Sequence, residues 1–337
     1  MKKWQFWLGL LVSAIFIYIA FRGLDFREIV FAITSADTIW ILPALPVYFF
    51  GLWLRAYRWK IFLKPIADLK TRKLFPIVAI GYMGNNIYPA RLGELIRAAI
   101  LKKDQDIAVS ASLATIIIER IFDAIVMLGF IILNLSAFSR MADSLEIKQT
   151  IDSVAAWGSG IFISAFLTFM IAAFFPGPSA RIIKKITARV LPQKHSQPIN
   201  NMIEKFFTGI QSLSSPIQTI ITLMVTIIIW LIETFFYWII MQAFSFDISF
   251  GTLMLLNGFL NLFTIIPSSP GYIGTFDAPG IALLTALGIE SQNAAGYTIL
   301  LHAALWLPVT LLGAFFFLQK GISWNDAINQ AKENKTR

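Results

Sequence analysis

The chain contains no cysteine and only two histidines, His195 and His302, among its 337 residues. Without cysteine, disulfide bridges, thiolate metal sites and a cysteine nucleophile are all excluded. Two histidines are too few for a histidine-rich metal site, so we expect neither a metal nor a cofactor. The sequence also lacks the glycine-rich loops that cradle nucleotides, and no Ser/His/Asp spacing indicates nucleophilic catalysis.

Charged residues are scarce as well. They make up 14% of the chain, whereas hydrophobic residues make up 57%, and a soluble protein of this length would carry more charge. Several apolar stretches approach the ~20 residues that cross ~30 Å of hydrocarbon. The composition therefore predicts an all-α polytopic membrane protein. We attribute the net charge of +9 to Lys and Arg retained in cytoplasmic loops rather than to nucleic-acid binding.

The apolar runs predict about six full transmembrane helices. Lys2 and Lys3 before the first run resemble the start of a signal peptide, but no small-residue cleavage motif follows, so we expect a retained helix. The predicted spans are Gln5–Phe21, Thr38–Leu54, Thr115–Phe138, Ile151–Phe175, Ile217–Phe244 and Thr298–Leu318.

Two segments, 74–101 and 251–288, interrupt this pattern with clustered Gly, Pro, Asn and charge. Irregular backbone leaves N–H and C=O groups unpaired, so at membrane depth it survives only inside protein or against a water-filled cavity. One broken segment in each half of a membrane chain is the best sequence pointer to a transporter-like binding site.

The distribution of positive charge predicts that both broken segments are re-entrant helical hairpins. With hairpins, most of the 28 Lys and Arg residues fall on the cytoplasmic side, and only Arg22, Arg27, Arg140 and Lys148 fall outside. Single crossings would move two basic groups, 91–103 and 181–205, outside, against the positive-inside tendency.

The same topology predicts one integral membrane domain, 1–337, that contains an inverted-topology repeat. The first half, 1–138, holds the hairpin 74–101, and the second half, 151–320, holds the hairpin 251–288. Pro89-x-x-x-Gly93-Glu94 also aligns with Pro270-x-x-x-Gly274-Thr275. Residues 321–337 form a polar tail.

Residues 179–205 form a basic amphipathic segment on the cytoplasmic side. Within 179–191, four apolar residues share one helical face, and Arg181, Lys184, Lys185 and Arg189 occupy much of the rest. Such a helix either lies in the interface and attracts anionic lipid or is a solvated loop helix. The sequence leaves both readings open.

Three charged residues, Glu119, Arg120 and Asp123, lie near the start of a predicted span. Charges in a span are costly and must face protein or water. One interpretation is an ion-pair network that ties this helix to the first hairpin; the other is a polar cavity that admits a charged headgroup. The two can coexist. The hairpin partners would be Arg91, Glu94 and Arg97.

Arg91 and Arg97 are the best candidates for contacting phosphate, because a guanidinium matches phosphate oxygens bidentately. Asn85 and Asn86 supply amide groups at the turn. The glycines Gly81, Gly84 and Gly93 permit either positive φ or close helix packing.

The second hairpin offers the hydroxyls of Ser268, Ser269 and Thr275. Asp277 is either a first-turn acid of the next helix or a ligand contact. Glu233, a lone acid in an apolar run, and His302 are candidates for ion or proton coupling.

Three stretches, 84–97, 112–123 and 267–276, resemble the lysylphosphatidylglycerol synthase transmembrane region family of flippase-like membrane proteins. The resemblance implies a bacterial or archaeal membrane module. In multiple peptide resistance factors this module is joined to a cytosolic domain that adds amino acids from tRNA to phosphatidylglycerol. The membrane part is thought to move the modified lipid between leaflets. Elsewhere the module accompanies glycosyltransferases acting on polyprenyl lipids. Tyr272 stands where relatives often have a second Gly, whereas Asp277 fits the family pattern.

Our leading hypothesis is a lipid flippase or scramblase-like transporter of an anionic phospholipid or polyprenyl-phosphate lipid, in the cytoplasmic membrane with both termini cytoplasmic. Because no transferase domain follows the membrane part, we expect the chain not to be an enzyme. The alternatives are a non-transporting, lipid-binding accessory subunit of a separate synthase or glycosyltransferase and, ranked last, an intramembrane transferase that uses Glu119 and Asp123.

Overall fold

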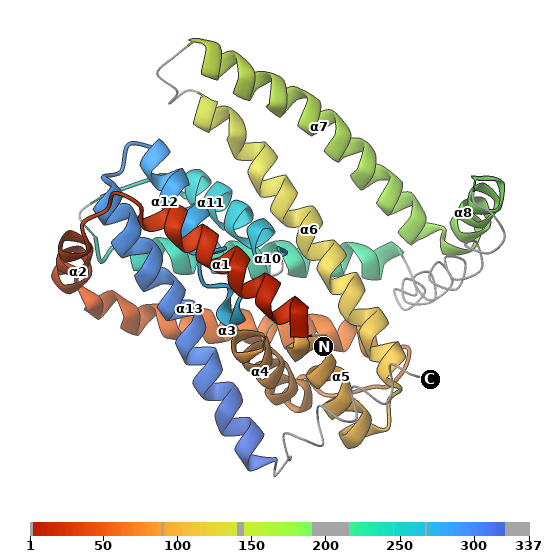
Figure 1. Ribbon diagram of the computed structural model, residues 1–337. Helices are drawn as coiled ribbons and strands as arrows, with labels where there is room; N and C mark the ends of the chain where they lie inside the picture. Colours follow the sequence, from red (N-terminus) through yellow and green to blue (C-terminus); the bar gives the residue numbers. More distant parts are fainter. Residues whose placement is uncertain are drawn as a thin grey trace.

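The computed structural model describes residues 3–88, 91–139, 145–190, 216–244, 246–266 and 268–320. Every regular element within these ranges is a helix (Figure 1), which confirms the predicted all-α fold. The predicted tail 321–337, the end of the basic segment, 191–205, and His195 lie outside the described residues.

The elements of the first half follow one another along the chain with short connections. They are α1 (Lys3–Phe21), α2 (Phe26–Ser35), η1 (Thr38–Trp40), α3 (Ile41–Leu63), α4 (Thr71–Ile87), α5 (Leu92–Gln105) and α6 (Val109–Ser139). Those of the second half are α7 (Leu145–Phe174), α8 (Pro176–Val190), α10 (Pro216–Met241), α11 (Phe250–Phe263), η2 (Pro270–Tyr272), α12 (Asp277–Ala286) and α13 (Ser291–Gln319).

Three helices of the described chain are long and apolar enough to cross a membrane, namely Thr38–Leu63, Ile217–Met241 and Ser291–Gln319. The number rises to as many as five if two bent helix pairs each count as one span. The predicted count of about six is loosely consistent with this. Helix α6 covers the predicted span 115–138 and carries the three charged residues at 119, 120 and 123.

Both broken segments form short helices on either side of an irregular stretch. At about 1.5 Å per residue, α4 and α5 are only about 25 and 21 Å long, which is less than the ~30 Å of the hydrocarbon core. The two pack directly on each other. A Cβ on Gly93 would lie 1.8 Å from the Gly81 carbonyl oxygen, and one on Gly84 would lie 2.7 Å from Gly93 Cα. These glycines therefore serve close packing, and none of the three has positive φ.

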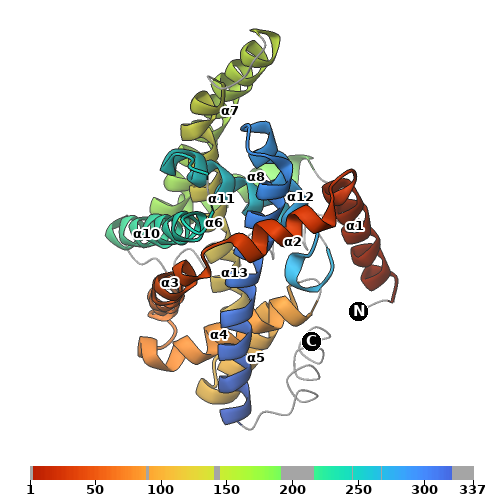
Figure 2. The same ribbon diagram turned by 90° about the vertical axis from the view of Figure 1, so that its left-hand side faces the viewer.

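Exchanging the two halves of the chain reproduces several of the main contacts between helices, although those of α6 with α7, α13 with α2 and α1 with α12 have no counterpart of similar extent among the described helices. Helix α3 packs on α10; α4 packs on α13, as its counterpart α11 packs on α6; and α5 packs on α6, as α12 packs on α13. Figures 1 and 2 both show α3 beside α10. Such an exchange pattern is expected of two structural repeats related by a pseudo-two-fold axis.

Each half also begins with a helix that bends sharply into an amphipathic one. The bend is 83° between α1 and α2 and 115° between α7 and α8. Helices α2 and α8 lie at opposite ends of the molecule in Figure 1. Sequence analysis described α8 but missed α2. Its start is marked by the N-cap residue Asp25, whose side chain accepts a hydrogen bond from Arg27 N at 2.8 Å.

Helix α3 extends nine residues beyond the predicted end at Leu54. Sequence analysis had placed Arg55 and Arg58 in a cytoplasmic loop, and the structure contradicts this. No Pro or Gly stands between Leu54 and Leu63 to end the helix earlier, and Pro65 follows its end. Trp59, Phe62 and Leu63 are completely buried on the continuation. The two arginines are thereby carried into the helix packing.

Candidate functional site

A cavity of about 140 Å³ lies where the two broken segments meet. Asn85, Asn86 and Arg91 line it from the first segment, and Thr264 and Gly271 from the second. The segments touch directly, because Arg91 Nη2 donates to the Thr264 carbonyl oxygen at 3.3 Å. A Cβ on Gly271 would lie 3.4 Å from the Asn86 carbonyl oxygen. The breaks in the two helices therefore form two walls of one site.

The backbone at both tips adopts the left-handed conformation. Arg91, the N-cap residue of α5, has φ +53°, and Gly271 and Tyr272 have φ +71° and +61°. This conformation is uncommon for residues other than glycine and concentrates at functional sites. Arg91 and Tyr272 both line the cavity, so the two non-glycine residues at the tips present their side chains to it.

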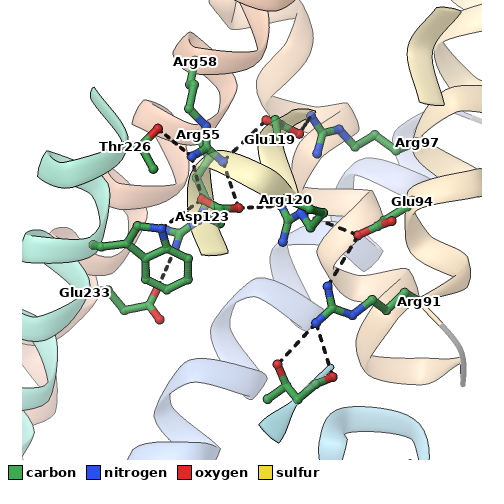
Figure 3. A network of polar contacts seen from close by, with 12 residues as sticks. Arg55, Arg58, Arg91, Glu94, Arg97, Glu119, Arg120, Asp123, Thr226 and Glu233 are labelled. Atoms are coloured by element: carbon green, nitrogen blue, oxygen red, sulfur yellow. Dashed lines mark hydrogen bonds and ion pairs between the residues drawn. The ribbon is translucent and has the colours of Figure 1, made fainter. Parts of the chain in front are cut away.

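Behind the cavity lies a deep cluster of short, buried ion pairs, which we define as Arg58, Arg97, Glu119 and Asp123 (Figure 3). Arg58 donates from Nη1 and Nη2 to the two carboxylate oxygens of Asp123, at 2.6 and 3.2 Å. Arg97 Nη2 lies 2.8 Å from Glu119 Oε2. Neighbouring groups complete the cluster. Trp230 Nε1 donates to Asp123 at 2.9 Å, Arg58 Nη1 donates to Thr226 Oγ1 at 3.0 Å, and the Arg97 guanidinium lies 3.7 Å from the centre of the Trp59 ring.

At the cavity the ion pairs are longer and more exposed. We call Arg91, Glu94 and Arg120 the cavity cluster. Glu94 lies 3.9 Å from Arg91 and 3.8 Å from Arg120, so one carboxylate is shared by two guanidinium groups at more than hydrogen-bond distance. Arg120 also lies 3.3 Å from Asp123, which links the two clusters. Buried polar atoms remain without a hydrogen-bond partner here, among them Arg120 Nε and Asn85 Oδ1.

A separate ion pair forms another part of the cavity wall. Arg55 Nη2 donates to Glu233 Oε2, and Asn261 Nδ2 donates to the other carboxylate oxygen at 3.5 Å. The Arg55 guanidinium lies against the Trp230 and Tyr82 rings, with centroid distances of 5.1 and 5.8 Å. All five residues line the cavity.

Taken together, the two clusters and the separate Arg55–Glu233 pair, which we call the linked set, carry more positive than negative charge. Five arginines are paired with only four carboxylates when every carboxylate is ionised. The arginines are Arg55, Arg58, Arg91, Arg97 and Arg120, and the carboxylates are Glu94, Glu119, Asp123 and Glu233. An uncompensated charge away from water is costly. The excess lies beside a cavity with unpartnered polar atoms, which is the arrangement that an anionic group would complete.

The second segment is fastened by His302. Its Nδ1 lies 2.8 Å from Asp277 Oδ1, and its Nε2 lies 2.8 Å from the Gly271 carbonyl oxygen. A carbonyl only accepts, so Nε2 carries a proton. Asp277 is also the first-turn acid of α12 and accepts from Gly274 N at 2.8 Å. This chain of bonds holds η2 against α12 and α13.

The structure divides the predicted site residues into four groups. Asn85, Asn86, Arg91, Arg120, Glu233 and His302 line the cavity. Glu94 and Asp123 contact its arginines, whereas Arg97 and Glu119 pair with each other behind it. In the second segment, Ser269 N donates to Ser13 Oγ of α1 and Thr275 Oγ1 donates to the Tyr272 carbonyl oxygen. Asp277 accepts from Gly274 N and contacts His302 of α13, and Ser268 is buried.

Sequence analysis missed two arginines and the aromatic wall of the site. Arg55 and Arg58 lie three residues apart just after an apolar run, a spacing that places them on one helical face if the helix continues. That spacing was the signal available. The aromatic side chains that line the cavity are Tyr48, Tyr82, Trp230, Tyr237, Tyr272, Phe276 and Trp306, and nothing in their spacing distinguishes them from core residues.

Comparison with known proteins supports the resemblance noted from the sequence. A family profile described as "Lysylphosphatidylglycerol synthase TM region" matches residues 6–313. The glycosyltransferase AglD of Haloferax volcanii is 21% identical over 98% of this chain and 56% of its own length. UPF0104 membrane proteins of Methanothermobacter thermautotrophicus and Methanocaldococcus jannaschii are 23% and 28% identical, over 85% and 69% of this chain and 87% and 92% of their own lengths. No solved structure matches the chain.

These names overturn one expectation. Sequence analysis predicted that the chain is not an enzyme, but a similar protein is named a glycosyltransferase and the matching family is described by a synthase. Both names point to transferase activity, so that prediction is wrong. The chain spans only about half the length of the glycosyltransferase that it resembles.

Proposed function

The chain belongs to the lysylphosphatidylglycerol synthase TM region family, and from that premise we propose that its cavity binds the phosphate of an anionic lipid and passes the headgroup between leaflets. The observation that carries the proposal is the single excess positive charge beside the cavity. A phosphodiester, as in a phospholipid or a polyprenyl-phosphate sugar, brings one negative charge and would neutralise the linked set.

The phosphate would lie between Arg91 and Arg120. Both guanidinium groups share Glu94 at 3.8–3.9 Å, so both keep donors available for a bidentate contact with phosphate oxygens. Arg120 Nε lacks a hydrogen-bond partner. The N-terminus of α5, which begins next to Arg91, also favours an anion.

Passage between leaflets would follow from the place of the cavity between the two repeats. Two broken segments that approach from opposite sides allow a polar headgroup to be held inside while the acyl or prenyl chains stay in lipid. We place the basic helix α8, with Arg181, Lys184 and Lys185, on the cytoplasmic face together with both termini, in a bacterial or archaeal cytoplasmic membrane.

A transferase that acts on the same headgroup is the second candidate. The names of the family and of one relative favour it. Within the cavity, His302 is the titratable group that a carboxylate orients, through its contact with Asp277, an arrangement suited to proton transfer. Leaflet transfer and headgroup chemistry would use the same phosphate site. The co-reactant would then come from a partner such as a glycosyltransferase.

Reconstitution into liposomes with fluorescent phosphatidylglycerol tests the proposal. We expect the wild-type protein to expose inner-leaflet lipid to a membrane-impermeant quencher faster than protein-free vesicles, and Arg91→Ala and Arg120→Ala to slow this. Asp106→Asn, which removes one charge from an exposed position away from the cavity, serves as the control. Lipid binding without any transfer would instead support an accessory lipid-binding subunit. The absence of both binding and transfer would refute the proposal.

A further inference from the structure

We infer that Glu233 sets the charge of the headgroup that the cavity accepts and selects a headgroup with one negative charge over one with two. This inference rests on the proposed function, because it concerns the same cavity. It goes beyond that function by assigning specificity to a residue that need not touch the phosphate itself.

The first observation is the place of the Arg55–Glu233 pair. Both residues line the cavity, although their side chains are only 9% and 11% exposed. Figure 3 shows Glu233 and Arg91 apart from each other, with Arg120 between them. Arg55 is held by Trp230 and Tyr82, and Glu233 by Asn261. The pair is therefore fixed in the wall, away from the Arg91 end of the site.

The second observation is the charge balance. Glu233 has no basic partner besides Arg55, and Arg55 has no acidic partner besides Glu233, among the described ion pairs. Each cancels the other, so the excess positive charge belongs to the part of the set that contains Arg91 and Arg120. One negative charge bound there completes the balance. A second negative charge would stay uncompensated in a cavity of about 140 Å³ that the Glu233 carboxylate also lines.

Removing the Glu233 charge would change this outcome. With glutamine at position 233, Arg55 becomes a second unpaired cation in the same wall, flanked by two aromatic rings. The cavity would then hold two separated positive charges that suit a headgroup with two negative charges. Glu233 thus makes the cavity selective by weakening the binding of a headgroup with two negative charges, as naturally selective sites do against competing ligands.

The experiment compares two lipids on the purified protein in detergent at pH 8. Phosphatidylglycerol is a phosphodiester with one negative charge, whereas phosphatidic acid is a phosphomonoester that can lose a second proton and so carries more than one. Phosphatidylcholine measures binding of a lipid without net charge. Dissociation constants are measured for the wild-type protein, Glu233→Gln and the control Asp106→Asn, an exposed position on the surface.

We expect Glu233→Gln to tighten phosphatidic acid binding by about tenfold, equivalent to ~1.4 kcal/mol, while phosphatidylglycerol changes much less. Asp106→Asn should leave the ratio of the two constants as in the wild-type protein. A ratio for Glu233→Gln within about twofold of the wild-type ratio would overturn the inference. The proposed function would still stand if Arg91→Ala weakened both anionic lipids, and it would fail if Arg91→Ala weakened neither.

A second comparison protects the test against a variant that does not fold. In Arg55→Gln, Glu233 is left unpaired and should repel phosphatidic acid more than phosphatidylglycerol. Adding Glu233→Gln to that variant replaces the whole pair by neutral residues and should restore the wild-type ratio. If the double variant keeps the ratio of Arg55→Gln alone, Glu233 does not select by charge.

Discussion

The deep cluster and the cavity cluster are built from the same residue types but differ in almost every physical respect. Behind the cavity, Arg58–Asp123 and Arg97–Glu119 pair at 2.6 and 2.8 Å, with side chains at most 9% exposed. At the cavity, the Arg91–Glu94 and Arg120–Glu94 distances are 3.9 and 3.8 Å, with side chains 25–33% exposed. The difference indicates that the deep cluster holds helices together, whereas the cavity cluster keeps its charges available for a ligand.

Asp123→Ala should give the largest effect, because it removes the carboxylate that two arginines and Trp230 share. Breaking a buried pair leaves an uncompensated charge and typically costs about 3–5 kcal/mol of folding stability. Unfolding of the purified protein in detergent, followed by circular dichroism, measures the loss. Stability within ~1 kcal/mol of wild type would show that the deep cluster does not hold α3, α6 and α10 together.

Arg91→Ala should separate binding from stability. We expect phosphatidylglycerol to bind about tenfold more weakly, or ~1.4 kcal/mol, because one arm of the phosphate site is gone. The unfolding free energy should change by less than about 1 kcal/mol, as is usual for a partly exposed ion pair. Equal losses of binding and stability would mean that the cavity cluster is structural as well.

Glu94→Gln should have a smaller effect of the opposite sign. Removing the shared carboxylate frees Arg91 and Arg120 for the ligand, so phosphatidylglycerol should bind about threefold more tightly, close to 0.7 kcal/mol. Isothermal titration in detergent is the measurement. Weaker binding would contradict the comparison, since it would mean that Glu94 positions the two arginines rather than competing for them.

Asp106→Asn should have the smallest effect and sets the baseline. Asp106 ends α5 on the surface, paired with Lys102, in the left-handed conformation that asparagine also tolerates. Stability and lipid binding should both stay within about 0.5 kcal/mol of wild type. A larger change in lipid binding would indicate that general surface charge, rather than the cavity, controls affinity.

Much of this architecture could be predicted from the sequence because the informative residues are exceptional for a membrane chain. Clustered Gly, Pro and Asn residues indicated the broken segments, and three charged residues in an otherwise apolar stretch indicated α6. Helix α2 was missed because it is only 10 residues long and begins directly after a turn. The end of α3 was misplaced because burial of Trp59 and Phe62, a tertiary effect, extends the helix past the apolar run.

The ion pairs of α6 with the first broken segment, Arg97–Glu119 and Arg120–Glu94, match one of the two interpretations of the sequence, but the pairs of Arg58 and Arg55 could not be predicted. Arg58 meets Asp123 across 65 residues, and Arg55 meets Glu233 across 178 residues, separations about which periodicity says nothing. Sequence analysis therefore grouped Arg97 with Arg91 as phosphate ligands. The structure places Arg97 behind the cavity, against Trp59 and Glu119.

The most direct test is an electron cryo-microscopy structure of the protein in nanodiscs rich in phosphatidylglycerol. We expect density for one phosphate within hydrogen-bond reach of both Arg91 and Arg120, with the Arg55–Glu233 pair intact. A cavity without headgroup density at saturating lipid, with Arg91 and Arg120 still sharing Glu94, would contradict the account.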